Sequence, residues 1–255
     1  DLRPGTYIFS GEVSYAQVLA ELKRGRSEAN TVNVTIPEGK TVPQIADIWE
    51  EAGLCTADEF LRCCAELDIP YDYIPAGEDF NQLEGFLFPE TYNVLITWGA
   101  EDLVKLQLAQ FDKNWTAERQ KLADEQGLTV KEIVTLASLI EREARVADER
   151  PLIASVIYNR LAIGQKLQID ATIQYILGEQ VDRVLYKDLE IESPYNTYLN
   201  AGLPPGAICS PGLSCIDAAL NPAETDYFYY RTKNDGSGEH NFAHTYEEHL
   251  QNANK

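Results

Sequence analysis

The stretch from Val130 to Leu161 most constrains what this chain can fold into. Its apolar residues recur at the three- and four-residue intervals of a helix, which predicts two helices joined at Ala147-Asp148. Asp148 is the expected cap of the second helix, and Pro151 falls in its first turn, where a missing N–H does no harm.

Two acids, Glu141 and Glu143, border the buried face of the first of these helices. On a helical wheel the apolar residues from Ile133 to Ala144 cover about 100°, and each acid lies roughly 80° from the centre of that stripe. An acid at the edge of a core-facing stripe is a candidate for proton transfer. The competing interpretation is that both are ordinary solvated residues, because carboxylates are mostly exposed. Helical geometry alone does not choose between them.

The first 65 residues show a short strand followed by a helix twice, and then a third helix. Strands alternating with short helices predict a compact α+β module. Residues 68–80 contain two prolines and a glycine without any period, so we place a domain boundary there and divide the chain into 1–75 and 76–255. The three helices begin at the capping boxes Ser14-x-x-Gln17, Thr41-x-x-Gln44 and Thr56-x-x-Glu59.

The second region is expected to be mixed, with mostly helices and a β-hairpin at its C-terminal end. One long helix is predicted over 100–126, and Thr129-x-x-Glu132 should begin the next helix. Asp170 is the expected N-cap of a short helix. Residues 227–232 should pair with residues 240–245 across a turn at Asp235-Gly236. The fold class is therefore α+β.

Composition excludes several classes of function. The 41 acidic and 21 basic residues give a net charge of −20, which would repel the phosphates of a nucleic acid. No apolar run is long enough to span a membrane. The chain begins without Met or a signal sequence, so we expect an ectodomain whose anchoring segment lies outside this chain. The three histidines match no zinc spacing, which argues against a metal site. Cys209 and Cys215 could pair in an oxidising compartment, or both could be buried free thiols.

Two further segments carry candidate binding residues. Glu84 lies among apolar residues in EGFLFPETY, where a carboxylate needs a partner or a function. Residues 193–212 are rich in Tyr, Asn, Pro and Gly. Tyrosine rings and Asn amides suit the C–H faces and hydroxyl edges of a sugar, although an ordinary rigid loop has the same composition.

Several long motifs, in this order, resemble one known family. TLASLIEREARVADERPLIASVIYNRL, the LQIDATIQYILG that follows it, and SPYNTYLNAGLPPGAICSPG are closely similar to segments of the endolytic murein transglycosylases, the YceG-like family. EGFLFPETY and the closing hairpin match as well. IPEGKTVPQIADIWEEAGL resembles the LysM-like subdomain of that family, so the module at 1–75 is expected to be LysM-like.

The resemblance implies a specific reaction. Members of this family cleave the β-1,4 bond between MurNAc and GlcNAc within peptidoglycan strands, leave 1,6-anhydro-MurNAc ends and terminate nascent chains. They work without a cofactor at the extracytoplasmic face of the membrane, and peptidoglycan synthases are the candidate partners. The family's catalytic glutamate lies in its ASxxE segment, which here ends at Glu141, so Glu143 is left as a flank residue. Polar family positions near the cleft correspond to Glu84, Gln168, Asp170, Tyr195, Asn196 and Tyr198.

This chemistry explains how one carboxylate can suffice. A hydrolase normally uses two, but here the C6 hydroxyl of the sugar is an attacking group already tethered to it. Two alternatives remain open: a non-catalytic peptidoglycan-binding scaffold, and a hydrolysing muramidase with Asp170 or Glu84 as its second carboxylate.

Overall fold

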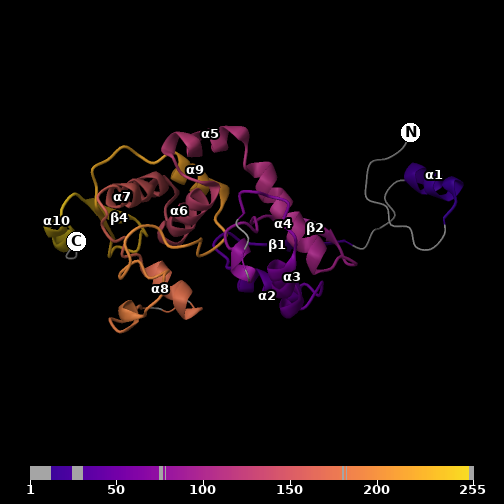
Figure 1. The fold of residues 1–255 in the computed structure, drawn as a ribbon, viewed down its shortest axis with the longest axis horizontal. Coiled ribbons are helices and arrows are strands. Elements are labelled where there is room, and N and C mark those ends of the chain that lie inside the picture. The colour runs from indigo at the N-terminus through magenta and orange to yellow at the C-terminus, as the bar shows by residue number, and fades with distance from the viewer. Residues whose placement is uncertain are drawn as a thin grey trace.

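The computed structural model describes residues 13–24, 31–74, 77, 79–179, 181 and 183–252. Helix α1 (Tyr15–Arg24) lies apart from the other elements in Figure 1. It begins as predicted, because the Ser14 N–H donates to Gln17 Oε1 at 2.7 Å and the Gln17 N–H donates to Ser14 Oγ at 3.3 Å. The strand expected before α1 lies outside the described residues.

The strand and two helices predicted next are confirmed. Each helix begins at a capping box in which the N-cap threonine and the third helical residue exchange hydrogen bonds. Trp49 and Phe60 project from the two helices into the core and are fully buried. The elements are β1 (Thr31–Thr35), α2 (Val42–Glu51) and α3 (Ala57–Glu66).

Strand β1 has its partner on the other side of the predicted domain boundary. It pairs antiparallel with β2 (Thr91–Leu95), with Thr31 opposite Leu95 and Thr35 opposite Thr91. The 3₁₀ helix η1 (Phe80–Leu83) packs against α3. The boundary near residue 75 therefore stays a prediction, and both sheet pairing and core packing join the residues on its two sides.

The single helix predicted over 100–126 is wrong. Helix α4 (Ala100–Asn114) ends before Trp115, and α5 (Ala117–Gln126) starts a new direction, as Figure 1 shows. Thr116 breaks the helix because its side chain accepts a hydrogen bond from the Arg119 N–H at 3.3 Å and caps α5. The periodic apolar residues that predicted the helix, from Val104 to Trp115, all precede the break and give no sign of it.

Helix α6 (Val130–Glu143) is the central element of the second half, on the left of Figure 1. It packs against α7 (Arg150–Ala162) and α9 (Leu213–Leu220), and α8 (Asp170–Leu177) contacts it near the site. All residues from Ile133 to Ile140 are buried.

The expected junction between α6 and α7 needs a correction. A 3₁₀ helix, η2 (Ala147–Glu149), separates them, and the N-cap of α7 is Glu149. Asp148 therefore does not cap α7, contrary to the prediction, whereas Pro151 does lie in its first turn. Glu149 is occupied elsewhere, because its carboxylate binds the main-chain N–H and the ring of His240 at 2.8 and 2.7 Å.

The C-terminal hairpin is confirmed. Strand β3 (Tyr229–Thr232) pairs antiparallel with β4 (His240–Ala243), and Thr232 lies opposite His240. Helix α10 (Tyr246–Gln251) follows and contacts both strands. A short 3₁₀ helix, η3 (Asp188–Glu190), lies in the long connection between α8 and α9. The architecture is mixed α+β, with helices predominating and two two-stranded sheets among the described residues.

Candidate functional site

Glu141 lies in the last turn of α6, at the edge of a pocket of about 270 Å³ that we call the Glu141 pocket. Its Oε2 accepts a hydrogen bond from the Gly212 N–H at 3.0 Å. Cys215 lies on the first turn of α9, and burial and then the Glu141 charge raise the pKa of its thiol. The start of α9 thus holds Glu141 in place, while its other oxygen accepts no hydrogen bond from the described residues.

Four carboxylates line the Glu141 pocket and come from three separate parts of the chain. Carboxylates that share a small pocket repel one another when all are ionised, which favours a proton within the group. Such a group can give a proton to a bound ligand or take one from it. The full set of lining residues is Glu38, Gly39, Glu141, Arg142, Glu143, Arg145, Asp170, Ala171 and Gln174.

Glu38 comes from the turn between β1 and α2, and sequence reasoning missed it. Gly39 has φ +77°, a conformation that favours glycine, and a Cβ there would lie 3.7 Å from Glu141 Cγ. Main-chain hydrogen bonds of 2.8 Å join this turn to Ser210, one from the Gly39 N–H and one to the Lys40 carbonyl oxygen. Burial and then the Glu141 charge raise the pKa of Glu38, against the opposing effect of Arg150. The nearest signal in the sequence was the Pro-Glu-Gly-Lys turn itself.

Glu143, which the sequence left as a flank residue, is half-buried and lines the Glu141 pocket. Its Oε2 accepts a hydrogen bond of 3.0 Å from the Tyr230 hydroxyl of β3. Burial is the main cause that raises the pKa of Glu143, and the charge of Asp170 adds to it. The Tyr230 bond and the Ala171 N–H act in the opposite direction. A raised carboxyl pKa in a pocket is a common property of functional acids. Glu141 and Glu143 therefore both remain candidates for the catalytic acid.

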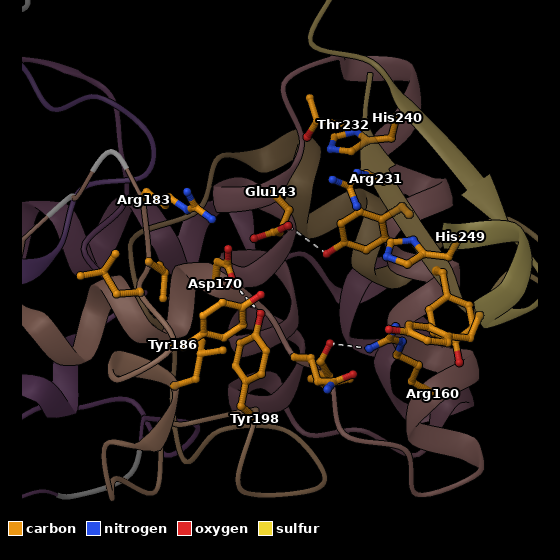
Figure 2. A pocket seen from close by; sticks show the side chains of 18 residues that line it. Glu143, Arg160, Asp170, Arg183, Tyr186, Tyr198, Arg231, Thr232, His240 and His249 are labelled. Atoms are coloured by element: carbon orange, nitrogen blue, oxygen red, sulfur yellow. Dashed lines mark hydrogen bonds between the residues drawn. The ribbon is translucent and has the colours of Figure 1, made fainter. Parts of the chain in front are cut away.

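A second cavity of about 580 Å³ adjoins the first, and we call it the tyrosine–arginine cavity. Glu143 and Asp170 line both spaces, and Figure 2 shows the two carboxylates facing the same cavity. Tyr198, one of the predicted binding residues, donates its hydroxyl hydrogen bond to Asp170. Asp170 is the first residue of α8 and Ile169 is the N-cap, so the predicted capping role of Asp170 is wrong.

Gln168 also lines the tyrosine–arginine cavity and has an unusual backbone. Its φ is +54°. Among the described residues, all others with a positive φ are glycines. The Gln168 N–H donates to the Thr197 carbonyl oxygen at 3.1 Å, and this bond helps to hold the strained conformation. Such strain is concentrated at functional sites in proteins.

A third cavity of about 470 Å³ also adjoins the Glu141 pocket, and we call it the Glu84 cavity. Glu84 is 3% exposed and accepts hydrogen bonds from the Val42 N–H at 3.2 and 3.3 Å and from the Tyr175 hydroxyl at 3.4 Å. Burial raises the pKa of Glu84 to about 8, although these bonds oppose the shift. Tyr195 lines the same cavity, with its ring centroid 5.0 Å from that of Tyr175.

The three spaces follow one another across the C-terminal end of α6. The Glu141 pocket shares Glu143 and Asp170 with the tyrosine–arginine cavity. It shares Arg142, Ala171 and Gln174 with the Glu84 cavity. The Glu141 pocket is therefore connected to both larger cavities through shared lining residues, and we call the three spaces together the cleft.

Asn196 does not join this cleft. Its side chain is fully buried, and its amide donates to the carbonyl oxygens of Leu189 and Ile191 at 3.0 and 2.8 Å. Its Oδ1 accepts the Tyr198 N–H at 2.9 Å. The structure thus gives Asn196 a role in shaping the loop that presents Tyr198, and no surface with which to contact a ligand.

The remaining chemistry of the described residues is limited. Cys209 and Cys215 are both fully buried free thiols, so the second of the two alternatives for this pair holds. Among the described residues, no group of three or more His, Cys, Asp or Glu side chains is arranged to hold a metal ion. No helix in the described ranges is long and apolar enough to cross a bilayer.

Comparisons with known proteins point to one family. The profile of the YceG-like family matches residues 1–255. The endolytic murein transglycosylase of Bacillus subtilis (strain 168) is 46% identical over 169 residues, which cover 66% of this chain and 46% of that protein. The protein of the same name from Streptococcus pneumoniae strain D39 is 33% identical over 258 residues, 90% of this chain and 46% of that protein. The chain thus spans about half the length of these curated relatives.

One solved structure is also similar. The crystal structure of a YceG-like protein from Listeria monocytogenes superposes with a TM-score of 0.76 at 33% sequence identity. The match covers 98% of this chain and 85% of that chain.

Proposed function

Because this chain belongs to the YceG-like family, as its motifs predicted, we propose that it is the cleaving part of an endolytic murein transglycosylase. Its substrate is a peptidoglycan strand, and it cleaves the β-1,4 bond between MurNAc and GlcNAc within that strand. The observation that carries this proposal is that the Glu141 pocket shares lining residues with two larger cavities. A strand of many sugars can pass through such a cleft and be cut in its interior.

Glu141 is the proposed acid. It protonates the glycosidic oxygen as the bond between C1 and that oxygen breaks, and the leaving sugar departs with the proton. The C6 hydroxyl of the MurNAc residue then attacks C1 from within the same sugar, at a low entropic cost. The ionised Glu141 takes the hydroxyl proton, so a 1,6-anhydro end forms and Glu141 is restored. The Gly212 N–H stabilises the carboxylate between the two proton transfers.

The polar residues of the cleft have proposed binding roles. Gln168, Asp170 and Tyr198 contact sugars on one side of Glu141, and Glu84 and Tyr195 shape the other side. Asn196 supports Tyr198 from beneath. The module at 1–75 is proposed to be LysM-like and to guide the strand. The chain acts at the extracytoplasmic face of the membrane through an anchoring segment outside this sequence, with peptidoglycan synthases as its partners.

The test compares two conservative variants. Glu141→Gln should fold normally and release no anhydro ends from purified peptidoglycan. Glu143→Gln is its matched control on the same helix end, and it should retain more activity because the amide can still accept the Tyr230 hydrogen bond. Undiminished cleavage by Glu141→Gln would refute the assignment, and loss of cleavage only in Glu143→Gln would move the acid to that residue. Strand binding without any turnover by the wild type would instead indicate a scaffold.

A hydrolysing muramidase is the second candidate, favoured by the carboxylates that share the Glu141 pocket. Asp170, one of the two predicted second carboxylates, could activate a water molecule on the sugar, as the second acid of a hydrolase does. Glu84, the other predicted one, lines the neighbouring cavity, whereas Glu38 lines the Glu141 pocket and could take this role. The hydrolysed product is heavier than the anhydro product by one water. Mass spectrometry of the released fragments therefore separates the two reactions, whichever residue is the acid.

A further inference from the structure

The two ends of the cleft differ in charge. Three arginines and two carboxylates line the tyrosine–arginine cavity, although the chain as a whole carries a charge of −20. The Glu84 cavity has the opposite balance, with Asp47 and Glu179 against Arg142, while burial keeps Glu84 largely protonated at neutral pH. A cation-rich cavity on a strongly acidic protein concentrates anions locally.

The charged groups of the tyrosine–arginine cavity differ in how they are occupied. Its carboxylates already have partners, since Tyr230 donates to Glu143 and Tyr198 donates to Asp170. Arg160 is also engaged, through the carbonyl oxygens of Phe228, Lys166 and Leu167.

Arg183 and Arg231 are in a different situation. Both are exposed and line the cavity, and Figure 2 shows them on either side of Glu143. Within the part of the chain that the structure describes, neither guanidinium forms an ion pair or a side-chain hydrogen bond. Two guanidinium groups whose donors bind no acceptor among the described residues of one cavity match a carboxylate, which an arginine can bind through two parallel hydrogen bonds.

We propose that Arg183 and Arg231 form a subsite for the carboxylate that a muramic acid residue of the strand presents in the tyrosine–arginine cavity. This inference rests on the proposed function and names what the site recognises in its substrate. Peptidoglycan offers two sources of this chemistry: the terminal and side-chain carboxylates of the stem peptide, or the free lactyl carboxylate where the stem has been removed. A strand made only of GlcNAc has neither.

The test measures KM and kcat on three forms of one strand preparation. The forms carry intact stem peptides, free lactyl groups after amidase treatment, or lactyl groups converted to neutral amides. In the double variant Arg183→Ala/Arg231→Ala, KM should rise roughly tenfold on a charged form, the loss expected for a charge-assisted hydrogen bond. On the amidated form KM should not change, and kcat should stay near the wild-type value on all three. Arg62→Ala, an exposed arginine on α3, is the matched control and should behave as wild type.

The arms of the test separate the possible outcomes. A rise in KM on stem-bearing strands identifies the stem peptide as the source, and a rise on stripped strands identifies the lactyl group. High salt should reduce either effect, because it screens exposed charges. An unchanged KM on both charged forms, or an equal rise on the amidated form, would overturn the subsite while leaving the proposed function intact. If the wild type cleaves none of the three forms, the proposed function itself fails.

Discussion

Glu84 is the most completely buried acid of the cleft, and its environment ties the protonation of one residue to the stability of the fold. It lies where the first turn of α2 meets α8, since Val42 and Tyr175 both donate hydrogen bonds to it. Burial still prevails over these bonds and raises the pKa of Glu84 to about 8. At neutral pH the folded protein therefore holds a proton there that the unfolded chain does not.

This linkage predicts a pH-dependent stability. A carboxyl whose folded pKa exceeds its unfolded value of 4.5 contributes its full stability below pH 4.5, and the contribution is lost as the pH rises through about 8. The free energy of unfolding of the wild type should thus fall, relative to Glu84→Gln, by an amount on the order of a few kcal/mol across that window. Urea denaturation of both proteins at several pH values measures the difference. Parallel curves for the two proteins would show that Glu84 does not titrate in this way.

Gly85 lies in the core beneath the cleft at a position where there is no room for a side chain. Its φ is +89°, and a Cβ there would lie 2.6 Å from both Ala207 Cβ and Val134 Cγ1. Gly53 has a similar φ of +73°, but a Cβ at that position would meet no atom within 4 Å. The two glycines therefore separate the cost of backbone conformation from the cost of steric overlap.

Gly53→Ala should cost about 1 kcal/mol of unfolding free energy, since only the left-handed backbone is strained. Gly85→Ala should cost about 2 to 4 kcal/mol, because overpacking of the core adds to that strain. Chemical denaturation of both variants gives the comparison. Equal losses of unfolding free energy in the two variants would mean that the core around Gly85 can rearrange to accept the methyl group.

At the level of elements, the residue at which helix α6 begins determines where Glu141 lies along the helix. The capping box at Thr129 fixes where the helix begins, with the Thr129 N–H donating to Glu132 at 2.8 Å and the Glu132 N–H to the Thr129 hydroxyl at 3.2 Å. Glu141 lies three turns further on, about 18 Å along the axis. A helix whose face is buried from Ile133 to Ile140 holds that distance rigidly.

Thr129→Ala should lower the stability of the protein by about 1 kcal/mol through loss of the cap. Cleavage measured well below the unfolding midpoint should stay near the wild-type rate, because packing and not the cap holds the far end of α6. Thr245→Ala, which removes the cap of the peripheral helix α10, is the control and should cost less. A large loss of activity in folded Thr129→Ala would contradict this picture.

These elements also show what a sequence can and cannot reveal. The boxes at Thr41, Thr56 and Thr129 are local signals of four residues, so each predicted a helix start correctly. The break at Thr116 was missed because the apolar residues that predicted the helix all lie before it, and Thr116 is not followed by the Glu or Gln of a capping box. Contacts between distant segments have no local signal, and for that reason Glu38 was not expected near Glu141. The wheel likewise placed Glu143 on a flank but could not foresee the Tyr230 hydroxyl beside it.

At the scale of the whole molecule, the two halves of the sequence share one core. Buried residues from the α2–α3 region and from the α6–α9 region belong to a single apolar cluster. Strand β2 pairs with β1, and the Glu84 carboxylate bonds to the first turn of α2. Removal of the segment before residue 76 would therefore expose both a strand edge and part of the core.

A fragment of residues 76–255 should fail to unfold cooperatively, whereas residues 31–255 should unfold in one transition. The first lacks the partner of β2 and leaves Glu84 without the Val42 N–H, while the second keeps both. Far-ultraviolet circular dichroism during urea denaturation distinguishes the two. A cooperative transition for 76–255 at the midpoint of the longer fragment would support an autonomous domain with a boundary near residue 75.

The junction of Gly39 and Lys40 with Ser210 has a consequence for protein engineering. Across this junction Glu38 packs so closely on Gly212 that a Cβ at that glycine would lie 1.9 Å from the Glu38 Oε1. Chimeras that exchange the front segment between homologous enzymes must therefore transplant residues 38–40 together with residues 208–212. Exchange of only one of these segments would place residues from two different homologues in contact directly beside Glu141. The mismatch would lower the turnover rate more than it would lower the stability of the fold.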